Sequence, residues 1–317
     1  MRLNVVVSNS TNPYVNIAVE NRLVTQPDEC SVTLYLWRNH RTVVIGQNQN
    51  PFAECNVEQL AADGGFVMRR TTGGGAVYHD DGNINFSFVA PPPLYDQGKQ
   101  FDVICRALND FGIEAQLSGR NDLTTGNRKF SGNAFSKGHH NWLHHGTLLI
   151  RSNVDDLSRY LRVKPSKLHK HGVASVQSRV VNLSELAPTL DSKNIVPHLI
   201  KAFESTYETK AETLDFDTIA NNEETKGLIK RYSSEEWLFG RWKYFNAQYS
   251  HQFEWGAAEL SLTIDEATHT ITNAILATDA LDVDLPQKAQ DILVGARTTE
   301  PPKTEDEKLN DLLSLIY

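Results

Sequence analysis

The sequence has few cysteines, no long hydrophobic run and no excess of positive charge, and each shortage excludes a class of protein. Its three cysteines, Cys30, Cys55 and Cys105, are scattered and form no C-x-x-C pair. This argues against a disulfide scaffold and a cysteine metal site, and it favours a reducing compartment. None of the 317 residues lies in an apolar run of eighteen, so no transmembrane helix is expected. Acidic side chains outnumber basic ones, 39 to 31, which argues against a general nucleic-acid surface.

Helices and strands are predicted to alternate irregularly along the chain. Apolar residues at helical spacing predict helices over 14–26 and 101–111. Residues 32–37 and 42–45 are rich in β-branched and aromatic side chains, which indicates strands. Residues 83–89 alternate apolar with polar side chains, at the period of a half-buried strand. Because no regular βαβ repeat is present, we predict an α+β fold with a mainly antiparallel sheet.

A domain boundary is predicted near residue 245, after an aromatic-rich segment that Gly240 interrupts. Beyond it, the pattern predicts a hairpin between residues 252 and 276 and two helices between 285 and 316. We therefore predict a large domain over 1–245 and a small C-terminal α+β domain over 246–317.

The densest motif is RRTTGGGAVYHD, which runs from Arg69 to Asp80. Consecutive glycines let the backbone approach a ligand closely, and successive N–H groups in such a loop can line an anion site. The adjacent arginines and threonines add donors for a carboxylate or a phosphate. For the glycines alone, a flexible turn between two strands is the plain alternative. The motif is not a Walker A loop, since no G-K-[ST] follows, and its glycine spacing is not that of a Rossmann fingerprint.

Two further motifs carry ionisable side chains. Lys129 lies in RKFSG, between a turn and a strand, where its ammonium could meet a phosphate or simply be solvated. Asp122, in GRNDL, could be a Mg²⁺ or ribose ligand, or a surface acid. His140 and His144 are four residues apart, which would suit a metal site on a helix, but this segment reads as a strand. A metal enzyme is therefore not predicted.

The order of these motifs is more specific than any one of them. RRTTGGGAVYHD is followed by GRNDL, RKFSG and HHGTLL, and this succession resembles the lipoate–protein ligase A family. The likeness extends from about Val5 to Leu183 and resumes at residues 237–240 and 253–256. Two departures are mild: the pair after the arginines is Thr-Thr where Ser-Ser or Arg-Ser is more usual, and the segment between GRNDL and RKFSG is short.

The resemblance implies a biotin/lipoate-ligase-like catalytic domain followed by a small accessory domain. It implies that lipoate reacts with ATP to give lipoyl-adenylate and pyrophosphate, with Mg²⁺ accompanying the nucleotide. The lipoyl group would then pass to a lysine of the lipoyl domains of 2-oxoacid dehydrogenases or of the glycine-cleavage H protein. We expect a monomer with no nucleic-acid or membrane partner, in a bacterial cytoplasm, although a mature mitochondrial form would have a similar sequence.

The resemblance also assigns roles to residues, with Lys129 contacting both the lipoate carboxylate and the α-phosphate. Residues 168–182 would form a loop that folds over the adenylate. Asp122 would be the Mg²⁺ ligand. Besides Lys129, the expected lipoate site comprises Trp37, Val44, Arg70, Thr72, Gly73, Gly74, Gly75, His79 and His145, and the expected nucleotide site comprises Thr71, Ala76, Val77, Tyr78, His79, Asp122, Ser178 and Arg179.

Electrostatics supports a lysine in this position. A carboxylate and an α-phosphate are both anions, so a fixed cation between them offsets their repulsion and the charge of the transition state. Holding the two anions in line also supplies proximity. The aliphatic tail of lipoate needs an apolar tunnel, for which Trp37, Val44 and Val77 are candidates.

Other activities fit parts of the same pattern. A lipoyltransferase that uses preformed lipoyl-adenylate or another activated acyl donor would carry the same motifs. An octanoyltransferase of this fold would need a cysteine nucleophile near the site, but Cys55 and Cys105 lie outside the motifs. A biotin ligase has a different glycine-rich signature, and the intact Lys129 argues against a silent lipoate-binding protein.

Overall fold

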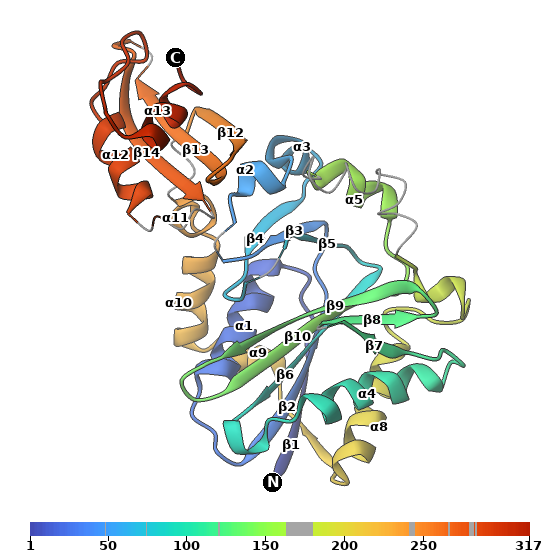
Figure 1. Cartoon of the computed structure of the whole chain (residues 1–317). Helices are drawn as coiled ribbons and strands as arrows, with labels where there is room; N and C mark the ends of the chain where they lie inside the picture. Colours follow the sequence, from blue (N-terminus) through green and yellow to red (C-terminus); the bar gives the residue numbers. More distant parts are fainter. Residues whose placement is uncertain are drawn as a thin grey trace. The chain divides into compact units, whose positions relative to one another are not determined.

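The structure is a computed structural model of the 317-residue chain. It describes residues 1–47, 49–73, 75–119, 121–162, 180–240, 245–265, 267–278, 282 and 284–317. The chain divides into two compact units, Met1–Phe239 and Gly240–Tyr317 (Figure 1). Each unit contains its own cluster of buried apolar side chains.

An eight-stranded sheet forms the centre of the first unit, in the order β11-β1-β2-β6-β10-β9-β8-β7. Five of its seven strand pairings are antiparallel, and β1 pairs in parallel with both β2 and β11. The predicted α+β fold with a mainly antiparallel sheet is therefore confirmed. The strands are β1 (Arg2–Val7), β2 (Ser31–Trp37), β6 (Asn83–Ala90), β7 (Gln116–Ser118), β8 (Asp122–Thr125), β9 (Arg128–Lys137), β10 (Trp142–Leu149) and β11 (Ala211–Thr213).

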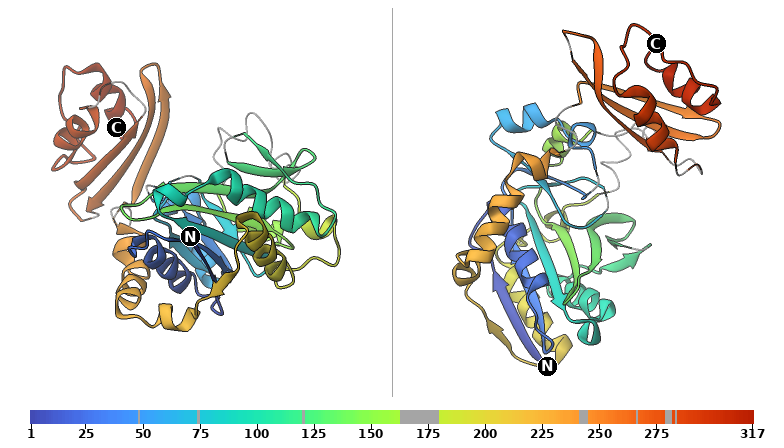
Figure 2. Two further views of the ribbon diagram at one scale, coloured as in Figure 1. Left: turned by 90° about the horizontal axis from the view of Figure 1, so that it is seen from below. Right: turned by 90° about the vertical axis from the view of Figure 1, so that its left-hand side faces the viewer.

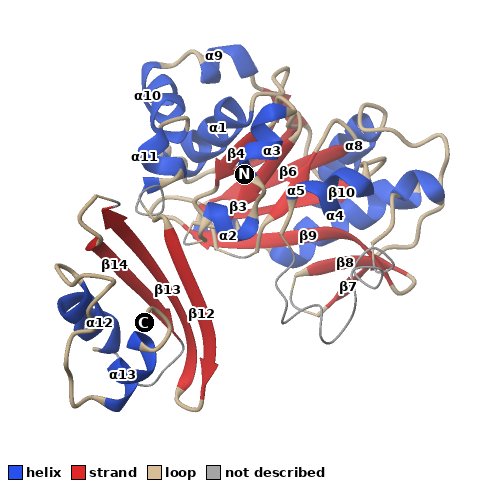
Figure 3. Ribbon diagram, turned by 90° about the horizontal axis from the view of Figure 1, so that it is seen from above, coloured by secondary structure: helices blue, strands red, loops and turns tan. Residues whose placement is uncertain are grey.

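Helices cover this sheet on both faces, as Figures 2 and 3 show. Because side chains alternate along a strand, Leu34 and Leu36 of β2 enter the core cluster with helices α4 and α8, whereas Tyr35 and Trp37 pack with α1, α9 and α10. The helices of this unit are α1 (Pro13–Thr25), α2 (Pro51–Glu54), α3 (Val57–Ala62), α4 (Gln97–Asn109), α5 (Val154–Tyr160), α8 (Ile195–Tyr207), α9 (Phe216–Ala220), α10 (Glu223–Tyr232) and α11 (Glu235–Leu238), with 3-10 turns η1 (Pro92–Leu94) and η2 (Leu183–Glu185).

Helix ends follow the capping residues in the sequence. Asn12 caps α1 by accepting a hydrogen bond from the N–H of Tyr14, and Pro13 occupies the first helical position, where no N–H is needed. Asp96 caps α4 through the N–H of Lys99, so this helix begins four residues before the predicted start.

A second, three-stranded sheet lies beside the first and carries the glycine motif. Its order is β4-β3-β5, with β3 (Thr42–Ile45) parallel to β4 (Phe66–Arg69) and antiparallel to β5 (Val77–His79). The glycine-rich segment between β4 and β5, called the glycine segment below, has the described residues 70–73, 75 and 76. It therefore connects the two outer strands across the end of β3. Thr72 of this segment contacts His145 of β10, so the segment lies next to the central sheet.

The second unit is a three-stranded antiparallel sheet with two helices packed on one face. The core contains Leu260 and Leu262 from the sheet and Leu285 and Leu312 from the helices. In the part of the chain that the structure describes, no helix is long and apolar enough to cross a membrane. The elements are β12 (Ala247–Phe253), β13 (Gly256–Asp265), β14 (Thr270–Thr278), α12 (Leu285–Leu293) and α13 (Glu307–Leu313).

Candidate active site

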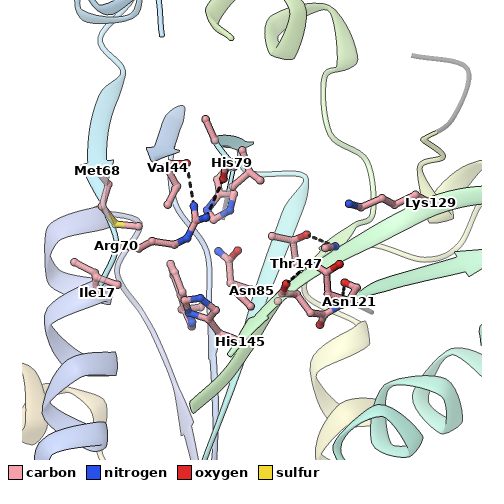
Figure 4. A pocket seen from close by; sticks show the side chains of 18 residues that line it. Ile17, Val44, Met68, Arg70, His79, Asn85, Asn121, Lys129, His145 and Thr147 are labelled. Carbon is pink, nitrogen blue, oxygen red and sulfur yellow. Dashed lines mark hydrogen bonds between the residues drawn. The ribbon is translucent and has the colours of Figure 1, made fainter. Parts of the chain in front are cut away.

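A cavity of about 280 Å³ lies between the glycine segment and strands β6, β9 and β10. Its two sides differ in character: in Figure 4, Ile17 and Met68 lie on one side, and Lys129 and Asn121 on the other. Its lining residues are Ile17, Trp37, Val44, Met68, Arg70, Gly75, Ala76, Val77, His79, Asn85, Asn121, Lys129, Gly132, Asn133, Ala134, His145, Gly146 and Thr147.

Arg70 organises the glycine segment from inside. Its Nη2 donates hydrogen bonds to the carbonyl oxygens of Gly73 (2.7 Å) and Gly75 (2.9 Å), and its Nη1 donates to the carbonyl of Val44 (3.3 Å). Burial lowers the pKa of Arg70 to about 10, and the charge of Glu20 opposes this shift. The guanidinium therefore stays charged at neutral pH, and its donors hold backbone carbonyls.

Arg69, the preceding residue, extends to a different set of backbone groups. Its Nη1 donates to the carbonyls of Gln47 (2.9 Å) and Gln49 (2.7 Å), and its Nη2 to that of Leu238 (2.7 Å). The sequence suggested that both arginines could offer bidentate contacts to an anion. In the structure both bind backbone carbonyls, and only Arg70 lines the cavity.

A buried chain of three side chains supports the glycine segment from the far side. Glu20 of α1 is 1% exposed, and its Oε1 lies 2.9 Å from Nδ1 of His145. A carboxylate can only accept, so Nδ1 carries a proton; in the neutral form of the ring, Nε2 of His145 then accepts from the Thr72 hydroxyl, which lies 3.0 Å away. Thr72 Oγ1 in turn accepts from Arg70 Nε at 3.1 Å. The tautomer of His145 and the position of the glycine segment are thus coupled to Glu20.

His79 is a buried neutral histidine. Burial, and then the positive charge of Arg70, lower its pKa to about 3. Its Nδ1 lies 3.3 Å from the amide nitrogen of Asn39, which donates to it, so Nε2 carries the proton. That Nε2 has no hydrogen-bond partner among the described residues. His79 therefore contributes an unused donor to the cavity wall.

Lys129 lies on β9, beside an irregularity in its pairing with β8 between Leu123 and Thr124. Its ammonium forms an ion pair with Asp122, Nζ to Oδ1 2.7 Å, and the two side chains are 41% and 36% exposed. Its carbonyl accepts a hydrogen bond from the N–H of Val181 at 2.9 Å. The backbone of Lys129 is therefore held on both sides, while its side chain remains accessible from the cavity.

The donor set offers little to a resident metal ion. In the described ranges no group of three His, Cys, Asp or Glu side chains could hold one. Asp122, the predicted Mg²⁺ ligand, is paired with a cation. Mg²⁺ is commonly held by one or two carboxylates together with substrate phosphates, so one carboxylate here fits an ion that arrives with a nucleotide.

The structure brings most of the predicted site residues together. Tyr78 is an exception: it faces the opposite side of β5 and packs against Tyr160, 5.5 Å between ring centroids. Thr71, Thr72, Gly73 and Asp122 do not line the cavity, although Thr72 contacts His145 and Asp122 pairs with Lys129. Gly74, Ser178 and Arg179 lie outside the described residues, as do residues 168–179 of the expected loop. The predicted residues that line the cavity are Trp37, Val44, Arg70, Gly75, Ala76, Val77, His79, Lys129 and His145.

Several residues of the site were missed from the sequence. Asn121 and Thr147 stand within the quoted motifs GRNDL and HHGTLL, so the motifs themselves could have indicated them. Glu20 and Asn85 lie in an ordinary helix and an ordinary strand, and nothing in their neighbourhood signals a cavity. The remaining missed lining residues are Ile17, Met68, Gly132, Asn133, Ala134 and Gly146.

Comparison with known proteins assigns the family. The family model described as the lipoyl protein ligase A/B catalytic domain matches residues 12–204. The chain belongs to the lipoate–protein ligase family. It is 38% identical over 292 residues to the lipoate-protein ligase A of Psychrobacter cryohalolentis, covering 90% of this chain and 86% of that one. It is 37% identical over 302 residues to the lipoate-protein ligase A of Bdellovibrio bacteriovorus, covering 93% and 88%.

A solved structure resembles the chain over nearly its whole length. The crystal structure of P. falciparum LipL1 in complex with lipoate superimposes with a TM-score of 0.68 and 30% sequence identity, over 99% of each chain. The family resemblance drawn from the motifs is therefore confirmed. The residues matched by the family model include every described lining residue of the cavity, so this ligase carries the cavity within its catalytic domain.

Proposed function

We propose that this ligase activates lipoate with ATP and transfers the lipoyl group to a protein lysine. The support is one cavity in which the apolar side chains of Ile17 and Met68 lie across from the ammonium of Lys129 (Figure 4). A volume of about 280 Å³ is near the lower end of the range for small-molecule sites. Ile17, Met68 and Val44 suit an aliphatic tail, and Lys129 suits the anionic head group.

In the first step, a carboxylate oxygen of lipoate attacks the α-phosphorus of ATP. The bond between this phosphorus and the bridging oxygen breaks, so pyrophosphate leaves with the bonding electron pair and lipoyl-adenylate remains. Lys129 would leave Asp122 and stand between the two anions, offsetting their repulsion and the charge that builds on the phosphoryl oxygens. Mg²⁺ would accompany the phosphates, with Asp122 as its ligand from the protein.

In the second step, the ε-amine of an acceptor lysine attacks the carbonyl carbon of the adenylate. An amide bond forms, AMP leaves and the amine loses a proton. The proposed acceptors are the lipoyl domains of 2-oxoacid dehydrogenases and the glycine-cleavage H protein. The second unit would be an accessory domain. We further infer that the ligase is a monomer that acts in the cytoplasm, where ATP and apo acceptors are present.

The test is incubation of the pure protein with ATP, Mg²⁺ and lipoate, followed by an apo lipoyl domain, read by pyrophosphate release and intact mass. We expect pyrophosphate without the acceptor and a lipoylated acceptor after it is added. Acceptor labelling only from supplied lipoyl-adenylate would instead identify a transferase.

Lys129→Ala is expected to abolish adenylate formation and to leave the fold intact. Lys137→Ala is the matched control, because Lys137 lies on the same strand but outside the cavity, over the ring of Trp142. Equal activity of the Lys129 variant and the control would refute the mechanism.

A further inference from the structure

His144 is a fully buried polar side chain that does not line the cavity. Four phenylalanine rings surround its imidazole, with those of Phe101 and Phe135 at 4.7 Å, centroid to centroid. The rings of Phe86 and Phe88 lie at 5.5 and 5.8 Å. An apolar ring would fill the same space without the cost of burying two nitrogens. The imidazole is therefore expected to be there for its hydrogen bonds.

Both nitrogens of His144 have a side-chain amide beside them. Nε2 lies 3.0 Å from Oδ1 of Asn133, and Nδ1 lies 3.0 Å from Oε1 of Gln100. Burial lowers the pKa of His144 to about 3, so the ring is neutral and has one N–H.

The Asn133 amide fixes which nitrogen carries the proton. Its Nδ2 donates to the carbonyl of Asn121 at 3.0 Å and to the hydroxyl oxygen of Ser131 at 3.2 Å, so its Oδ1 must face His144. Nε2 of His144 therefore carries the proton and donates to Asn133. Nδ1 is left as an acceptor, which the Oε1 of Gln100 cannot satisfy. The Nε2 of Gln100 has no partner among the described residues, so a half-turn of this amide brings a donor to Nδ1 and leaves no other hydrogen bond of Nε2 broken.

Asn133 also connects His144 to the side of the cavity that contains Asn121 and Lys129. Besides the side-chain contact, the backbone N–H of Asn133 donates to the Asn121 carbonyl at 2.9 Å, and Asn121 Nδ2 donates back to the Asn133 carbonyl at 2.9 Å. Asn121 immediately precedes Asp122, the ion-pair partner of Lys129. The position of the Asp122–Lys129 pair thus depends on how firmly Asn133 is held.

Gly146 leaves the space that the Asn133 amide needs to reach His144. It is the cross-strand partner of Asn133 on β10. A Cβ at this position would overlap Oδ1 of Asn133 and the ring of Phe86. A glycine is therefore required where the amide crosses between the strands.

We propose that His144 is a positioning residue of the ligase: through Asn133 and Asn121 it sets the geometry of the Asp122–Lys129 pair without touching the substrate. This inference rests on the proposed function, in which Lys129 acts on the carboxylate and the α-phosphate. A small displacement of such a group lowers the rate of the chemical step more than the binding of the remote tail.

The experiment compares three variants with the wild type. His144→Phe fills the phenylalanine cage but removes the donor to Asn133. His144→Gln retains an N–H donor. Phe101→Leu disturbs the packing of the four phenylalanine rings around His144 but removes none of the hydrogen bonds that link His144, Asn133 and Asn121. It is therefore the matched control for packing.

We expect His144→Phe to lower kcat for adenylate formation about tenfold or more, with less than a twofold change in KM for lipoate. His144→Gln should recover part of kcat. Phe101→Leu should lower Tm without lowering kcat. Asn133→Ala combined with His144→Phe should be no slower than the slower single variant, because both interrupt one chain.

A second measurement does not depend on activity. In the ligand-free protein, amide hydrogen exchange in a peptide that contains Asn133 should accelerate in His144→Phe and stay unchanged in Phe101→Leu. Unchanged exchange or wild-type kcat in His144→Phe would overturn the inference. A kcat in Phe101→Leu as low as that of His144→Phe would also overturn it, because disturbed packing alone would then explain the loss. An inactive wild type with the expected exchange pattern would instead refute the proposed function. The hydrogen bonds from His144 to Asn133 and Asn121 would then have a structural role only.

Discussion

Lys129 and Asp122 form an ion pair, Nζ to Oδ1 2.7 Å, although both side chains are more than a third exposed to solvent. Exposed ion pairs contribute about 0–1 kcal/mol to stability. The pair is therefore easily opened by a stronger anionic partner. In the proposed mechanism, it would hold the ammonium at the edge of the cavity until a carboxylate or a phosphate binds there.

Asp122→Asn should change the free energy of unfolding by less than about 1 kcal/mol and lower kcat for adenylate formation about tenfold. The reason is that the carboxylate orients Lys129 and would meet the Mg²⁺ of the nucleotide. Urea unfolding and pyrophosphate release measure the two effects. Asp110→Asn is the control, since Asp110 is equally exposed and pairs with His198 at 2.7 Å. Wild-type kcat in the Asp122 variant would contradict the assignment.

Gly132→Ala should lower activity several-fold with little change in stability. A Cβ there would lie 3.2 Å from Nζ of Lys129 and 3.4 Å from its Cε, so the flexible end of the side chain would shift by a few tenths of an ångström. The control is Gly227→Ala, where a Cβ meets nothing within 4 Å and the helix should gain about 0.5–1 kcal/mol. Thermal melts and kcat distinguish the two glycines; equal kcat in both variants would show that Lys129 tolerates the shift.

Glu20→Gln should raise KM for lipoate about tenfold. The carboxylate accepts from both His145 Nδ1 and the Ser87 hydroxyl (2.5 Å), and an amide that presents its NH2 group would reverse the His145 tautomer. Thr72 would then lose its acceptor, and an unsatisfied buried group costs about 1–3 kcal/mol. Nitrogen chemical shifts of the imidazole report the tautomer directly.

Glu224→Gln provides a control for the Glu20 variant, because Glu224 is an exposed acid of α10 that pairs with Arg22, and Arg22 lies on α1, as Glu20 does. Its KM for lipoate should be that of the wild type. An unchanged tautomer together with an unchanged KM in Glu20→Gln would remove Glu20 from the site.

Stability should fall as the pH is lowered from about 6.5 toward 3, in part because of His79 and His144. Both have a pKa lowered to about 3 by burial, whereas the unfolded chain protonates these groups near pH 6.5. The unfolded state therefore binds more protons in this window, and stability increases with pH across it. Between pH 7 and pH 5 each group should account for about 2 kcal/mol of the loss.

Urea unfolding of His144→Phe at the two pH values measures this contribution. The variant lacks one of the two titrating groups, so its loss of stability between pH 7 and pH 5 should be smaller than that of the wild type by about 2 kcal/mol. Parallel pH profiles for the two proteins would show that His144 is not buried and neutral as described.

The local features of this fold could be predicted from the sequence, and the long-range ones could not. The helix predicted over 14–26 is observed as Pro13–Thr25, because its cap and apolar spacing are local signals. The parallel pairing of β1 with both β2 and β11 joins residues about 30 and 200 positions apart, and no pattern within β1 encodes its neighbours. The sheet type was predictable from the irregular order of elements; the strand order was not.

The same limit applies to the site. The glycine motif stood out in the sequence because a run of glycines beside two arginines is a local signal. Lys129 taken alone could equally be a solvated lysine, and its assignment came from the family resemblance of the ordered motifs. Glu20 was missed because an acid on a helix is ordinarily solvated, and only its tertiary neighbours bury it. Tyr78 shows the converse: its place in the motif suggested a ligand contact, but alternation along β5 directs Val77 and His79 to the cavity and Tyr78 away from it.

The hydrogen bonds of Arg70 also determine what the glycine segment can offer to a ligand. A peptide group is planar and trans, so its C=O and N–H point in opposite directions. Because the carbonyl of Gly75 turns toward the guanidinium, the N–H of Ala76 is directed away from it. The segment can therefore attract an anion with amide dipoles while the arginine behind it binds the carbonyls of Val44, Gly73 and Gly75. A lysine at position 70 would keep the positive charge, but its single ammonium group could not bind all of these carbonyls at once. The peptide groups of the segment would then be less firmly held, and their dipoles less well aligned.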